Sequence, residues 1–170
     1  MLSQDEARFP LVPTLRSTLG LKGHRPTVGT WDNKDQVYSV AALNLVTGQL
    51  TTPLLEQPAR CQAKTGQSKP KRLQEAFAAH LGDIARAYAA CRYAEVVIPI
   101  DNAPWHRGAL VEQVLQAHPH LRLKRLPSDS PQLNIIERFW RVLRRRATHN
   151  RLFTHMARLR ATLRNNLCYF

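Results

Sequence analysis

The stretch VVIPIDNAPWHRG, residues 96–108, decides how the fold is predicted. It belongs to a short, continuous apolar run, Glu95–Ile100, which is typical of a buried strand in a parallel sheet. The run ends on Asp101, although a charged carboxylate is costly to bury without a partner. Asp101 is therefore either a turn-forming residue at the start of a loop or a functional carboxylate carried by a rigid strand.

Strands and helices alternate on both sides of this predicted strand. The 170 residues are enough for one domain with its own core. Alternation and turn residues predict a hairpin of Gln36–Asn44 and Leu50–Leu55 around a turn at Val46–Gln49. An exposed polar loop is expected at 57–72. The other expected elements are helices at Leu73–Tyr88, Ala109–Ala117, Asn134–Thr148 and Thr154–Leu167, and a strand at Leu121–Leu126.

This order predicts a single α/β domain over residues 1–170, with a mixed β-sheet flanked by α-helices. In such sheets, ligand sites lie beyond the carboxyl ends of the strands. Asp101 stands at one of these ends.

The charge of the chain is strongly positive and uneven. There are 25 Lys and Arg against 12 Asp and Glu, a net charge of +13. Residues 121–170 hold 12 of the basic residues and only two acids, Asp129 and Glu137. This distribution predicts a polyanionic partner, most simply nucleic acid. The arginines of the Asn134–Thr148 helix either contact DNA or form a solvated helix face; they are Arg138, Arg141, Arg144, Arg145 and Arg146.

Several classes of protein do not fit the sequence. No apolar run approaches the ~20 residues of a membrane span, and the N-terminus lacks the pattern of a signal peptide. The three cysteines, Cys61, Cys91 and Cys168, follow neither a zinc-ligand spacing nor a disulfide framework. We therefore expect a cytoplasmic protein without a membrane partner.

Glu137 is the second candidate carboxylate. It follows Asn134 by three residues, so it either closes a capping box or serves as a ligand beside the arginines of its helix. From spacing alone, Asp5, Asp32 or Asp35 can supply a third acid. Asp5 and Glu6 would point to opposite faces of a strand, so at most one of them joins a given site.

Three acids beside a basic surface fit phosphodiester chemistry. Mg²⁺ is held by a few carboxylates together with water and substrate phosphates. Two such ions can assist both the attacking and the leaving oxygen of an in-line displacement at phosphorus.

Three segments carry a resemblance to a known family: SQDEARF at 3–9, IDNAPWHRG at 100–108 and LPSDSPQLNIIERFWRVLRRR at 126–146. Over nearly its whole length the chain resembles the catalytic domain of the DDE transposases of bacterial insertion sequences, in the mariner superfamily. The 35 residues between Asp101 and Glu137 match the spacing of that family.

The resemblance implies a ribonuclease-H-like fold in which Asp5, Asp101 and Glu137 are catalytic and hold two Mg²⁺ or Mn²⁺ ions. It implies DNA cleavage and strand transfer on transposon ends and target DNA, by a homodimer associated with the bacterial nucleoid. Asn102 and His106 are either residues that support the ligands or ordinary loop residues.

The family also carries helix-turn-helix modules ahead of this domain. We expect such a segment to be encoded upstream, and the first strand looks shortened. Two alternatives remain at this point: a catalytically inactive, DNA-binding remnant, and a ribonuclease-H-like nuclease.

Overall fold

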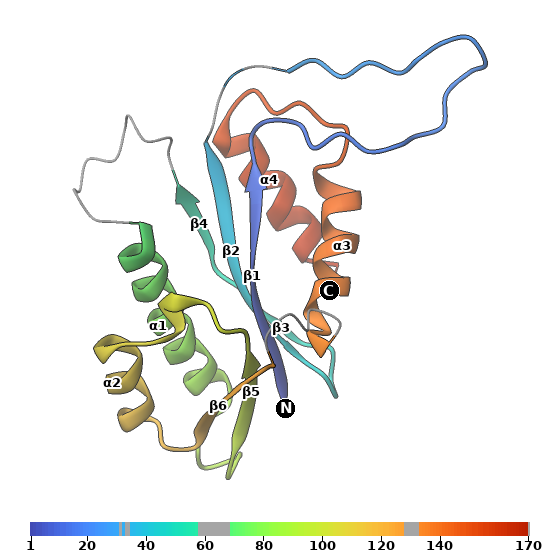
Figure 1. The fold of residues 1–170 in the computed structure, drawn as a ribbon. Helices are drawn as coiled ribbons and strands as arrows, with labels where there is room; N and C mark the ends of the chain where they lie inside the picture. The colour runs from blue at the N-terminus through green and yellow to red at the C-terminus, as the bar shows by residue number, and fades with distance from the viewer. Residues whose placement is uncertain (31, 33–34, 58–68, 128–132, 170) are drawn as a thin grey trace.

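The computed structural model has a central sheet with helices on both sides (Figure 1). It describes residues 1–30, 32, 35–57, 69–127 and 133–169. The strands are β1 (Leu2–Pro10), β2 (Gln36–Asn44), β3 (Leu50–Thr51), β4 (Leu54–Gln57), β5 (Val96–Ile100) and β6 (Leu121–Arg125). The helices are α1 (Lys69–Ala87), α2 (Ala109–Ala117), α3 (Ile136–Ala147) and α4 (Met156–Leu167), with a 3₁₀ turn at Pro104–His106. The predicted mixed sheet flanked by helices is confirmed.

The strands pair in two groups that lie next to each other. β2 pairs antiparallel with β1, β3 and β4. β5 and β6 pair in parallel, and β5 packs beside β1. The carboxyl end of β5 therefore reaches the middle of β1, and the loop that follows β5 lies against it.

Alternation along β1 and β2 creates one hydrophobic core on each face of the sheet. Leu2, Val40 and Ala42 face the side covered by α1 and α2, where they pack with Phe77 and Ile98. The residues of opposite parity face α3 and α4; they are Ala7, Phe9, Leu11, Val37 and Ala41. Successive side chains of a strand point to opposite faces, so β1 can present one acid to each side.

The second strand of the predicted hairpin differs from its prediction. Leu50–Leu55 is interrupted at Thr52 and Pro53, so it forms β3 and β4 instead of one strand. Proline has no N–H to donate to a ladder, which explains the break. The register against β2 is the same on both sides of it, from Leu43↔Leu50 to Gln36↔Gln57. The predicted turn is confirmed, with Gly48 at a φ of 73°.

The predicted polar loop at 57–72 is too long at its C-terminal end. α1 already begins at Lys69, because Lys, Pro and Arg are all tolerated in the first turn of a helix. The middle of the loop, residues 58–68, lies outside the described residues. The other predicted helices and strands are found, with ends that differ by no more than two residues.

The first strand spans nine residues, and each of them has a partner in β2. None of the helices in the described residues is both long and apolar enough to cross a membrane.

Candidate active site

Asp101 lies just beyond the carboxyl end of β5, where the sequence predicts a site. Its Oδ1 accepts a hydrogen bond from the backbone N–H of Ala103 at 2.9 Å, so Asp101 does form a turn. The side chain is still 52% exposed, and among the described residues no hydrogen bond or ion pair uses Oδ2. Asp101 therefore forms a turn through Oδ1 and still offers Oδ2 to a ligand.

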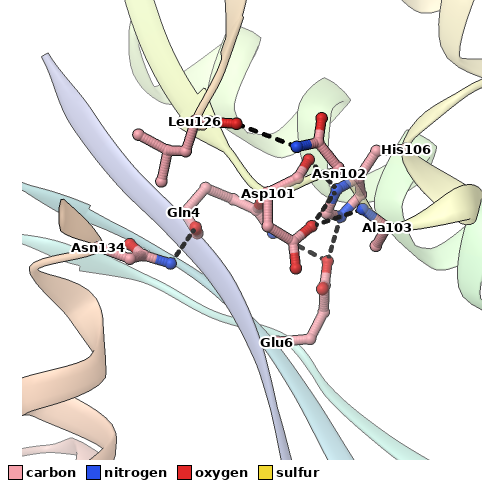
Figure 2. Close-up of polar contacts among 8 residues, drawn as sticks. All are labelled: Gln4, Glu6, Asp101, Asn102, Ala103, His106, Leu126 and Asn134. Atoms are coloured by element: carbon pink, nitrogen blue, oxygen red, sulfur yellow. Dashed lines mark hydrogen bonds and ion pairs between the residues drawn. The ribbon is translucent and has the colours of Figure 1, made fainter. Parts of the chain in front are cut away.

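Asn102 supports the loop rather than the carboxylate. Its Nδ2 donates to the carbonyl oxygen of Leu126 at 3.0 Å, while the N–H of Leu126 donates to the carbonyl of Ile100 at 2.8 Å. These two bonds tie the end of β5 to the end of β6, and Figure 2 shows the one from Asn102 to Leu126. Asn102 thus holds the backbone from which Asp101 projects.

His106 connects Asp101 to β1. Its side chain is completely buried and packs against the ring of Phe77, with a centroid distance of 4.3 Å. Nδ1 lies 3.0 Å from Oδ1 of Asp101, and Nε2 lies 2.8 Å from Oε1 of Glu6. Figure 2 shows His106 between these two carboxylates. His106 is buried and has two acidic partners, so it is not an ordinary loop residue, which was one of the two predicted alternatives.

The two carboxylates determine the charge of His106. Burial by itself lowers the pKa of the imidazole, but the hydrogen bonds to Asp101 and Glu6 outweigh it and raise the pKa to about 9. In turn, the hydrogen bond from His106 lowers the pKa of Asp101, and burial opposes this only partly. At neutral pH His106 is therefore an imidazolium whose two ring nitrogens both donate, Nδ1 to Asp101 and Nε2 to Glu6.

A buried contact seats the start of α3 on β1. Ser3 Oγ donates to Oδ1 of Asn134 at 2.7 Å and accepts from the backbone N–H of Ile136 at 3.2 Å. Nδ2 of Asn134 also donates to the carbonyl oxygen of Gln4 at 3.4 Å. Asn134 therefore bonds to β1 and makes no side-chain cap of its own helix, whose N-cap is Ile135. The capping-box interpretation of Glu137 is wrong for this reason.

Glu137 follows Ile136 directly and is exposed. Ser3 and Asp5 have the same parity on β1, so Asp5 points to the face on which α3 begins. Burial, and then the charges of Glu6, Glu137 and Asp101, raise the pKa of Asp5 to about 8. Asp5 therefore stands in the electrostatic field of both other candidate acids.

The alternative third acids lie elsewhere. The backbone of Asp35 pairs with Leu11 at the far end of β1. Six residues of strand separate Leu11 from Asp5, which is about 20 Å. Asp32 is an exposed residue of the β1–β2 connection.

The donor chemistry of Asp5, Asp101 and Glu137 fits a hard divalent cation. All three offer carboxylate oxygens. The pKa of Asp5 is raised first by burial and then by the neighbouring acids, and a bound cation would offset both effects. Among the described residues, however, no three His, Cys, Asp or Glu side chains form a group that holds one ion.

The five arginines of α3 divide into two kinds. Arg144 lies over the ring of Phe9, 5.7 Å from its centroid, and Arg146 lies over the ring of Tyr169 at 4.7 Å. The other three, Arg138, Arg141 and Arg145, are exposed, and no ion pair with an acid is found for them in the described part of the chain. They provide unneutralised positive charge beside Glu137.

Ser3 and Glu6 are site residues that the sequence patterns did not identify. The sequence predicts that at most one of Asp5 and Glu6 joins a given site, yet Glu6 contacts Asp101 through His106 while Asp5 occupies the opposite face of β1. The alternation of side chains along β1 was the available signal. It places Glu6 on the face opposite Asp5, and the loop after β5 packs on that face. Ser3 gave no signal, because its partner is 131 residues away in the chain.

Comparisons with known proteins support this description. A family profile described as DDE superfamily endonuclease matches residues 1–160. The structure is similar to the Mos1 transposase paired-end complex with left transposon end, with 17% identity, a TM-score of 0.65, and coverage of 96% of this chain and 46% of that one. The structure is also similar to the Mos1 mariner paired end complex with Mn, with 16% identity, a TM-score of 0.65, and coverage of 96% of this chain and 46% of that one.

The structure of Mos1 transposase catalytic domain and Raltegravir with Mg gives 15% identity, a TM-score of 0.58, and coverage of 96% and 68%. Curated protein sequences gave no match. The chain thus spans about half the length of the first two chains it resembles. The likeness in structure confirms the predicted ribonuclease-H-like fold, and the family profile, which covers most of the chain, shows that the chain belongs to the DDE superfamily of endonucleases.

Proposed function

We propose that this chain is the catalytic domain of a transposase that cuts DNA at the ends of a mobile element and joins it to target DNA. Two sets of contacts carry the proposal. The Ser3–Asn134 bond seats the start of α3, and with it Glu137, on the face of β1 to which Asp5 points. His106 links Asp101, after β5, to Glu6 of the same strand. Related structures in complex with a transposon end and with Mn or Mg support DNA as substrate and a divalent metal as cofactor.

Each residue of the site has a role in this proposal. Asp5, Asp101 and Glu137 hold two Mg²⁺ or Mn²⁺ ions, which when bound supply Lewis-acid assistance to the attacking and leaving oxygens at phosphorus. His106, held by Glu6, keeps the Asp101 carboxylate in place. The exposed arginines Arg138, Arg141 and Arg145 bind the DNA backbone.

Two displacements of one kind follow at this site. In the first, a water oxygen bonds to the phosphorus of the scissile phosphodiester, and the bond to the 3′-oxygen breaks, which leaves a 3′-hydroxyl. In the second, that hydroxyl attacks a phosphodiester of the target and displaces its 3′-oxygen. Because both steps are in-line displacements, one set of carboxylates serves both.

Partners outside this chain belong to the same proposal. Paired-end complexes of the related transposase support a homodimer that holds two DNA ends. An upstream helix-turn-helix segment would read the sequence of those ends. DNA as the substrate makes the bacterial nucleoid the expected location.

The test is nicking of supercoiled plasmid DNA in the presence of Mg²⁺ or Mn²⁺. We expect the wild type to cut and Asp101→Asn not to cut, although the variant still binds DNA. Glu112→Gln is the control, because it neutralises one exposed acid on α2, away from the site. Equal cutting by Asp101→Asn and by the wild type would refute the assignment.

Two further measurements on the wild type, DNA binding at varied salt and cleavage of an RNA–DNA hybrid, separate the two alternatives. Salt-sensitive DNA binding without cutting by the wild type would indicate a non-catalytic binding protein. Cleavage of an RNA–DNA hybrid, but not of DNA, would indicate a ribonuclease-H-like nuclease.

A further inference from the structure

A basic hollow of about 670 Å³ lies where the connection after β1 meets the turn between α3 and α4. We call it the basic hollow and define it by Arg16, Ser17 and Thr18 from the connection and by Arg141, Arg145 and His149 from α3 and the turn after it. All six side chains can donate a hydrogen bond, His149 in either tautomer. Its walls come from segments more than 100 residues apart in the sequence.

Asn150 fixes the geometry of the basic hollow. It has a positive φ of 55°, a conformation that asparagine tolerates better than most residues. Its Oδ1 accepts from the backbone N–H of Arg16 at 2.8 Å, and its Nδ2 donates to the carbonyl of Arg16 at 3.0 Å. A backbone bond from Asn150 to the carbonyl of Thr14 at 3.1 Å adds to this clamp. Three hydrogen bonds to Asn150, in the turn after α3, therefore hold the backbone that carries the Arg16 side chain.

Within the described residues, the positive charge of the basic hollow has no acidic partner. No ion pair of Arg16, Arg141 or Arg145 occurs in the described ranges of the chain, and these arginines are exposed. Burial, and then the charges of Arg16, Arg144 and Arg145, lower the pKa of His149. A clamped cluster of guanidinium groups without carboxylates suits a phosphate, which arginine can bind with two parallel hydrogen bonds.

The basic hollow is in line with the active site. Glu137, Arg141, Arg145 and His149 follow one another at intervals of four residues, so they lie along one side of α3 and its end. Eight residues of helix between Glu137 and Arg145 span about 12 Å. A DNA strand that passes Glu137 can therefore reach the basic hollow within a few nucleotides.

We propose that the basic hollow binds a backbone phosphate of the DNA strand that runs from the active site along α3, within a few nucleotides of the reacting phosphate. The inference rests on the proposed function, because it takes DNA as the substrate. It adds Arg16 and its clamp Asn150 to the residues that position DNA.

The experiment measures the affinity of the chain for a fluorescent 20-base-pair DNA duplex of arbitrary sequence between 50 and 200 mM KCl. Loss of one phosphate contact should reduce the slope of log K against log salt by about one and lower the affinity about eightfold at 0.1 M salt. We expect this for Arg16→Ala. Arg92→Ala is the matched control, because it removes the same charge from an exposed site after α1.

Asn150→Gly tests the clamp without a change in charge. Glycine accepts the positive φ, so only the hydrogen bonds to Arg16 are lost. We expect a lower affinity than that of the wild type, with an unchanged circular dichroism spectrum. A folded Asn150→Gly variant that binds DNA as the wild type does would overturn the role of the clamp.

The outcomes distinguish the inference from the function on which it rests. If the wild type binds and cuts DNA while Arg16→Ala behaves like Arg92→Ala, the basic hollow is not a phosphate site and the proposed function stands. If the wild type neither binds nor cuts DNA, the proposed function fails. If Arg16→Ala does weaken binding, six duplexes locate the contact. Each carries a single neutral methylphosphonate at one of the first six positions beside a nick. The position that weakens wild-type binding should have no effect on Arg16→Ala.

Discussion

Asp5→Asn should stabilise the metal-free protein while it abolishes DNA cutting. The pKa of Asp5 rises from 3.8 to about 8 in the folded chain, so the folded state holds a proton that the unfolded state releases. Between pH 3.8 and pH 8 the folded state binds more protons, and its stability therefore falls as the pH rises through this window. Asparagine has nearly the same shape and does not titrate.

The size of the effect follows from the shift in pKa. At pH 7 the difference from 3.8 corresponds to about 4 kcal/mol, at about 1.4 kcal/mol per pH unit. Asp5 keeps some contact with solvent and is coupled to its neighbours, so we expect about 2 to 3 kcal/mol. For a chain of this size that is a rise in Tm of about 5 to 10 °C.

Thermal unfolding in EDTA at pH 4.5, 6 and 8 measures this prediction. The Tm of Asp5→Asn should exceed that of the wild type only slightly at pH 4.5, and this difference in Tm should grow up to pH 8. Glu112→Gln should show no such trend. Mn²⁺ should raise the Tm of the wild type more than that of Asp5→Asn, because the cation stabilises the ionised carboxylate. An advantage that does not change with pH, or a less stable variant, would refute the coupling of the acids.

Three further predictions concern the neighbours of the site. His80 is fully buried, neither of its ring nitrogens has a partner in the described part of the chain, and burial lowers its pKa to about 4. The unfolded state thus binds more protons between pH 4 and 6.5, and stability is lost as the pH falls through that window. His80→Leu should raise the Tm at pH 5 more than at pH 8, and equal gains at both would contradict this. Ser3→Ala leaves the buried Oδ1 of Asn134 without its donor and should lower the free energy of unfolding by about 1 to 3 kcal/mol in urea; no change would mean that α3 is seated by other contacts. Glu6→Gln removes the anionic partner of His106 and should weaken Mn²⁺ binding at least about tenfold by electron paramagnetic resonance, whereas unchanged affinity would make Glu6 purely structural.

Most of the secondary structure could be predicted because it depends on local patterns. The ends of α2 and of β2 agree with the structure residue for residue, since a change from polar to apolar periodicity marks them. Pro53 was not recognised as a break, because proline is also compatible with an edge strand. The start of α1 was missed, because the charged residues before Leu73 are typical of loops and of first helical turns alike.

The candidate acids could be found from sequence only through their motifs. Nothing in the local pattern distinguishes the turn at Asp101 from a metal site, or the first turn at Glu137 from a capping box. The capping interpretation failed because Asn134 bonds to Ser3 in a strand that is distant in the sequence. Such a contact leaves no periodic signal in either segment.

The sequence by itself determined the class of fold and the basic character of the C-terminal third, and it indicated three candidate acids with their motifs. Hydrophobic periodicity, charge and motif spacing are properties of neighbouring residues, so they can be read along the chain. Only the tertiary structure decided which face of β1 each acid occupies, that His106 joins Glu6 to Asp101, and that Asn150 clamps Arg16 beside α3. These features depend on the packing of β1 between β2 and β5 and on side-chain contacts across 100 residues or more, which local preference does not specify.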